Sequence, residues 1–67
     1  MHAYKMMGLF VVEMESPAKA RALYGALPDG LRAGCELTAR MDGAQLKTPS
    51  SDAADWIASH YDEVRAA

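Results

Sequence analysis

The chain is 67 residues long, 51% hydrophobic, and carries a formal net charge of −2. This charge balance lacks the strongly basic field that draws proteins to nucleic-acid phosphates, and no run of about 20 apolar residues is present to span a membrane. Cys35 is the only cysteine, which excludes an intrachain disulfide and favours a reducing, cytoplasmic compartment. We therefore expect residues 1–67 to form a single small α+β domain.

The first predicted element is a strand over residues 3–14, which are rich in aromatic, methionine and β-branched side chains. Its middle is apolar on both faces, as in a strand at the centre of a sheet. A helix should then start at Ser16 and Pro17, because serine is a good N-cap and proline suits the first helical position. We expect this helix to run to about Leu27, where the Pro-Asp-Gly sequence of residues 28–30 ends it.

A hairpin is predicted over residues 34–48, where two segments of alternating polarity flank a turn around residues 41–43. The Asp-Gly pair in that turn favours a type I′ turn, in which both central residues have positive φ. Residues 48–52 offer several N-caps for a last helix, which should continue close to the C-terminus. The predicted order is β-α-β-β-α, with a three-stranded sheet and two helices packed on one face.

Packing of both helices on one face would leave the other face of the sheet uncovered. Alternation along the first strand places Met7, Leu9 and Val11 on the uncovered face, and Tyr4 and Met6 on the helix-facing one. The expected rim of this apolar strip is polar: Lys5, Glu13, Glu36, Arg40, Gln45 and Lys47. Because apolar patches with polar rims often mark interaction sites, the strip is a candidate partner-binding site. The alternatives are that the two helices lie on opposite faces of the sheet, or that the strip is small enough to be tolerated without a partner.

A second candidate surface is an acidic stripe on the last helix, formed by Asp52, Asp55, Asp62 and Glu63. A wheel of 100° per residue gathers these carboxylates on the side opposite the apolar stripe. Carboxylates in such a row can engage a basic groove on another protein. The alternative is that the stripe is only the solvated side of the helix.

No catalytic, cofactor-binding or metal-binding constellation is predicted. His60 lies on the apolar side of the last helix, one turn after Trp56, so we expect a packed histidine and no catalytic base. Cys35 is expected to be a small core residue. The glycines of residues 30–34 match neither a phosphate-binding loop nor a dinucleotide fingerprint. The histidines, the cysteine and the scattered carboxylates lack the spacing of metal ligands.

In its small size, alanine content and mild acidity, the chain resembles small bacteriophage or mobile-element accessory proteins, including anti-CRISPR inhibitors. This is a resemblance of type, and it carries over no functional residue. It implies a non-enzymatic protein-binding module that inhibits a larger host complex in the cytoplasm of a bacterial or phage-infected cell. Two alternatives stay open: a homodimeric ligand-binding or antitoxin-like component whose sheets pack through the apolar strip, and a weak nucleic-acid binder that uses Lys19, Arg21 and Arg32.

Overall fold

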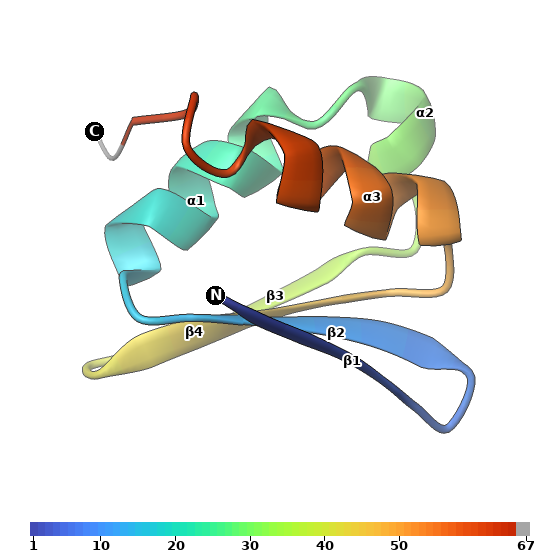
Figure 1. The fold of residues 1–67 in the computed structure, drawn as a ribbon, viewed down its shortest axis with the longest axis horizontal. Coiled ribbons are helices and arrows are strands. Elements are labelled where there is room, and N and C mark those ends of the chain that lie inside the picture. Colours follow the sequence, from blue (N-terminus) through green and yellow to red (C-terminus); the bar gives the residue numbers. More distant parts are fainter. Residues whose placement is uncertain (66–67) are drawn as a thin grey trace.

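A computed structural model describes residues 1–65 as a four-stranded antiparallel sheet with three helices on one of its faces (Figure 1). The elements in chain order are β1 (His2–Met6), β2 (Leu9–Met14), α1 (Pro17–Ala26), α2 (Asp29–Arg32), β3 (Glu36–Arg40), β4 (Gly43–Thr48) and α3 (Ser51–His60). The strand order is β1-β2-β4-β3, so two hairpins meet through their second strands. The α+β class and the placement of the helices on one face are confirmed.

The predicted single strand over residues 3–14 is wrong, because this segment is a hairpin that turns at Met7 and Gly8. Met7 has a φ of 53° and Gly8 a φ of 80°, as a two-residue type I′ turn requires. The turn adds a fourth strand, and a short helix, α2, follows α1. The order is therefore β-β-α-α-β-β-α, and the predicted three-stranded β-α-β-β-α order is corrected.

The second hairpin is confirmed, but its turn differs from the predicted one. Met41 and Asp42 form the two-residue loop, and Gly43 begins β4 without a positive φ. Glycine is required at this position for a steric reason, since a Cβ would lie 2.8 Å from the carbonyl oxygen of Met14 on β2. The Asp-Gly pair therefore marks a close approach of two strands and not a type I′ turn.

Both predicted helix starts are confirmed by their N-caps. Ser16 Oγ accepts a hydrogen bond from the backbone N–H of Lys19 at 3.1 Å, and Ser50 Oγ accepts one from Ala53 at 3.2 Å. α1 ends close to its predicted end, whereas α3 ends at His60, earlier than predicted. The first and last helices are thus fixed by local signals that the sequence displays.

The core lies between the sheet and the two longer helices. Val12 of β2 and Leu46 of β4 are partners in the register, and neither is more than 1% exposed. Leu23, Leu27 and Ile57 from the helical layer pack against this pair. Burial of a side chain of this size contributes about 1.5–3 kcal/mol relative to exposure. The helix-facing side of the sheet is therefore the side that stabilises the fold.

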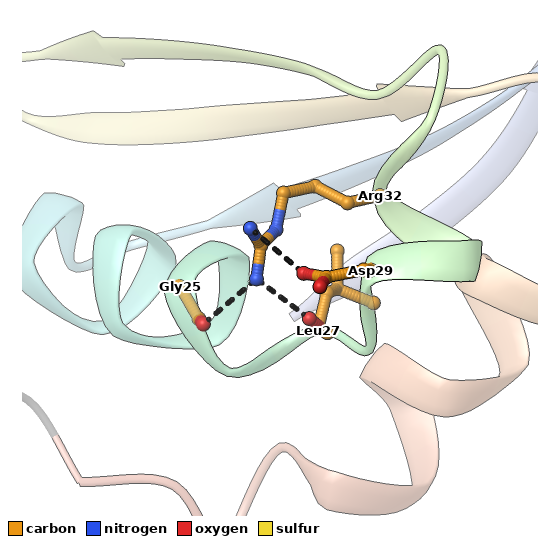
Figure 2. Close-up of polar contacts among 4 residues, drawn as sticks. All are labelled: Gly25, Leu27, Asp29 and Arg32. Atoms are coloured by element: carbon orange, nitrogen blue, oxygen red, sulfur yellow. Dashed lines mark hydrogen bonds and ion pairs between the residues drawn. The ribbon is translucent and has the colours of Figure 1, made fainter.

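Arg32 fastens the end of α1 to α2. Its Nη2 donates hydrogen bonds to the carbonyl oxygens of Leu27 at 2.8 Å and Gly25 at 3.1 Å, and its Nη1 lies 3.3 Å from the Asp29 carboxylate (Figure 2). The guanidinium also lies 5.8 Å from the ring centroid of Tyr24. Carbonyls at a helix C-terminus lack intrahelical donors and carry the negative end of the helix dipole, so a cation stabilises them.

Replacing Arg32 with methionine should lower the free energy of unfolding by about 1–2 kcal/mol, because two carbonyls lose a charged donor while the apolar stem is kept. Urea denaturation measures the change. Arg21→Met is the matched control, since Arg21 is an exposed arginine on α1 and its loss should have almost no effect. Equal stabilities of the two variants would show that Arg32 does not hold the two helices together.

Candidate protein-binding surface

The candidate site is the face of the sheet that no helix of residues 1–65 covers, which we call the open face (Figure 1). Partners in an antiparallel register share a face, so the register assigns its residues. In the order of the strands they are His2, Tyr4 and Met6 from β1; Leu9, Val11 and Glu13 from β2; Gln45 and Lys47 from β4; and Glu36, Thr38 and Arg40 from β3.

The apolar end of the open face lies beside the turn between β1 and β2. Met6 is 46% exposed and Met7, in the turn itself, is 93% exposed, while Leu9 is half-buried. Val11 lies on this face as predicted, but it is only 1% exposed because its register neighbours on β1 and β4 flank it. The accessible apolar surface is therefore formed by Met6, Met7 and Leu9, and Val11 packs beneath it.

Met7 occupies a backbone position that suits it poorly. The first central position of a type I′ turn favours asparagine, aspartate or glycine, and a positive φ is uncommon for other residues. At 93% exposure, the side chain gains almost no packing energy from its own chain that would offset this strain. Residues held in such conformations cluster at functional sites, which makes Met7 a candidate contact residue.

The opposite end of the open face is polar and contains a shallow depression of about 270 Å³. Its lining includes Glu13, Thr38, Arg40, Gly43 and Gln45. The carboxylate oxygen Oε2 of Glu13 accepts hydrogen bonds from the Tyr4 hydroxyl at 3.1 Å and from Gln45 Nε2 at 2.8 Å. These two bonds join side chains of β1, β2 and β4 across the face.

The surroundings of Glu13 favour its ionised form. The hydrogen bond from Gln45 is the main cause that lowers the pKa of Glu13, and the bond from Tyr4 is the next. Partial desolvation raises this pKa, and electrostatic interactions with His2 and Arg40 lower it further, so the net shift is downward. Desolvation raises the pKa of Tyr4, and the bond to Glu13 adds to this increase. The polar end therefore presents a fixed negative charge beside the exposed cation of Arg40.

The predicted acidic residues lie away from the open face. Asp52 and Asp55 are exposed on α3, whereas Asp62 and Glu63 are exposed but follow the end of that helix. Since α3 covers the helix-facing side of the sheet, the open face and these carboxylates are separate surfaces (Figure 1). The two groups of predicted partner-binding residues are not brought together.

His60 is packed as predicted, whereas Cys35, predicted to be a small core residue, lies just before β3 and is only half-buried against the core. The His60 ring stacks on Trp56 with 4.2 Å between centroids, and Cys35 Sγ donates a hydrogen bond to the Leu31 carbonyl at 3.3 Å. Within residues 1–65, no three histidine, cysteine or acidic side chains are placed to hold a metal ion. The helices of this described part are all too short or too polar to cross a membrane.

Sequence reasoning missed the contribution of β1 to the open face. The prediction of one strand places Tyr4 and Met6 on the helix-facing side and Lys5 on the polar rim, and the hairpin reverses this. Tyr4 pairs with Val11 on the open face, while Lys5 pairs with Phe10 on the other, with its Nζ 5.3 Å from the phenyl centroid. The available signal was the glycine inside an apolar run, because such a glycine often marks a turn or bulge.

Comparisons with known proteins found no family model, curated protein or solved structure that matches this chain. Functional inference therefore rests on the two surfaces described above. The open face offers both apolar and charged groups in a defined arrangement, and the acidic residues offer charge alone.

The stability of the fold should depend on the ionisation of Glu13. Because the pKa of Glu13 is lowered by folding, its stabilising contribution is complete above the ordinary value of 4.5 and is lost as the pH falls through the lower folded value. Glu13→Gln should flatten this part of the stability profile, measured by urea denaturation from neutral to acidic pH. Glu15→Gln, which changes an exposed carboxylate on the same segment, should keep the wild-type profile. A full acid-dependent loss in Glu13→Gln would contradict the role assigned to this network.

Relieving the strain at Met7 should stabilise the protein. Met7→Asn should raise the free energy of unfolding by about 0.5–1 kcal/mol, because asparagine tolerates the left-handed conformation that the turn imposes. Met6→Asn is the control, since Met6 lies in β1 with ordinary strand geometry and asparagine is unfavourable in strands. Destabilisation by Met7→Asn, measured in the same thermal unfolding experiment, would show that the turn is not strained.

Proposed function

We propose that this chain is a non-enzymatic protein-binding module that presents the open face of its sheet to a partner protein. The observation that carries the proposal is the gathering of Met6, Met7 and Leu9 at one end of a face that no helix covers in the described part of the chain. Unbranched methionine side chains adapt to irregular apolar surfaces, and their burial against a partner is favourable. The strained conformation of Met7 supports the same role.

The polar end of the open face orients the bound partner. Glu13 is held in place by two hydrogen bonds, and the exposed Arg40 lies beside the same depression. Charges of both signs in fixed positions select a complementary partner and fix its register more than they increase affinity. In this proposal the apolar end contributes most of the binding free energy and the polar end discriminates between partners.

The module acts by occupying a surface of a larger complex, as a small inhibitor from a bacteriophage or mobile element would. The open face spans the longest and the shortest dimension of the molecule, 28 and 17 Å, because the helices stack on the sheet along the third dimension (Figure 1). These dimensions limit the face to roughly 500 Å², well below the ~800 Å² per partner of a standard interface. Tight binding through so small a face requires a few well-packed contact residues. We place this activity in the cytoplasm, where the free thiol of Cys35 is compatible with the redox conditions.

The nucleic-acid alternative is weaker because two of its three basic residues are already engaged. Arg32 binds carbonyls and a carboxylate of its own chain, and Lys19 Nζ lies 4.7 Å from the ring centroid of Tyr61. Arg21 is exposed on α1. Nucleic-acid binding needs several contacts between basic side chains and phosphates, and of these three residues only Arg21 is left to make one.

Photo-cross-linking in the native host tests which surface binds. Benzoylphenylalanine at Met7 or Lys47 should give the same discrete protein adduct, because both positions lie on or beside the open face. The same probe at Asp55 or at Asp62 is the matched control on the other side of the molecule and should give no adduct. Adducts formed only from Asp55 and Asp62 would assign binding to the acidic surface and overturn the proposal.

Affinity measurements with the cross-linked partner, once it is purified, should distinguish a contact role of Met7 from an effect of Met7 on the stability of the fold. Met7→Asn should weaken binding by about tenfold, which corresponds to a loss of more than about 1 kcal/mol of binding free energy. The same substitution should stabilise the fold. Asp55→Asn should leave the affinity unchanged, as measured by calorimetry. Unchanged affinity of Met7→Asn would remove the apolar end from the interface.

A further inference from the structure

β3 is an unprotected edge of the sheet. It is last in the strand order, and four of its five residues are exposed. Arg40 of β3 and Gly43 of β4 flank the two-residue loop of this hairpin. In a hairpin with such a loop, the two flanking residues are a hydrogen-bonded pair, so their peptide groups point toward each other. Since hydrogen-bonded and non-hydrogen-bonded pairs alternate, the peptide groups of Leu37 and Ala39 point toward the free edge. No element within residues 1–65 pairs with them.

The sequence of this edge is complementary to itself in one antiparallel register. If Thr38 lies on a two-fold axis, Leu37 of one copy is opposite Ala39 of the other, so the peptide groups that point outward meet each other. In that register Glu36 of each copy is opposite Arg40 of the other. Threonine then faces threonine at the centre, which is also a favourable cross-strand pair.

The charges needed for this pairing are available. Within the described residues the single ion pair joins Arg32 to Asp29, and both Glu36 and Arg40 are exposed. The other edge strand, β1, offers no such match, because it contains the basic residues His2 and Lys5 and no acidic residue. A lysine on an edge strand also protects it against pairing. Self-association should therefore use β3 and not β1.

We propose that two copies of this chain pair through β3, antiparallel and about a two-fold axis at Thr38, to form one continuous eight-stranded sheet. We assign a second copy to this edge because Glu36 of each copy then lies opposite Arg40 of the other, so both copies supply both charges. All helices then lie on one side, and the two open faces become one surface. Its centre carries the two polar depressions, and its far ends carry Met6 and Met7 of each copy. This inference does not depend on the identity of a partner protein.

Sedimentation equilibrium from micromolar to millimolar concentration should show a monomer–dimer equilibrium. Arg40→Glu places glutamates opposite each other at both ends of the pairing, and should weaken dimerisation by about tenfold or more. The double variant with Glu36→Arg and Arg40→Glu restores opposite charges in the same register and should restore the dimer. If the double variant dimerises again, the loss in Arg40→Glu is due to the pairing of residues 36 and 40 across the two-fold axis and not to a general effect of charge.

Amide hydrogen exchange provides a second readout that a merely structural change would not reproduce. The amides of Leu37 and Ala39 should exchange more slowly as the dimer forms, while the amides of β1 at Ala3 and Lys5 should not change. A monomer at every concentration, a dimer that Arg40→Glu leaves intact, or assembly that continues beyond two copies would each overturn the proposal. The last result would indicate pairing of β3 with β1, which forms open chains of subunits.

Discussion

The antiparallel pairing of β2 with β4 is the interaction on which the rest of the structure depends. It joins two hairpins that are separated in sequence by the first two helices. On one side of this pair, Val12 and Leu46 form the floor of the core, and α1 and α3 cover them. Residues 1–65 contain no further element that covers the other side, so the pairing that builds the core also creates the open face.

The parts of the fold that depend on neighbouring residues could be predicted from the sequence. The caps at Ser16 and Ser50 and the alternation of the second hairpin are local signals, and the structure contains them. The turn at Met7 could not be predicted in the same way, because methionine is unfavourable there and the apolar run conceals it. The uncovered face and the position of Leu9 on it follow from the pattern. The burial of Val11 does not, since it depends on pairing with β1, which the turn at Met7 makes possible, and with β4, which is distant in the sequence.

The two ends of the open face differ in chemistry, and this difference follows the direction of the strands. Met6, Met7 and Leu9 lie at the end where β1 turns into β2, whereas Glu13, Arg40 and Gly43 lie at the opposite end, where β3 turns into β4. Apart from Val11, the side chains of this face lie outside the buried core, so packing constrains them less. The strain at Met7 fits the proposed role of the apolar end, because proteins break local rules mainly where function requires it.

The most direct test of the central claim is solvent paramagnetic relaxation of side-chain methyl groups by an inert gadolinium chelate, with and without the cross-linked partner. In the free protein, the methyls of Met6 and Met7 should relax strongly while those of Val11 are protected. Binding should protect both methionines and leave the exposed methyl of Ala58 on α3 unchanged. Protection of Ala58 with both methionines still accessible would contradict the claim that the open face is the binding surface.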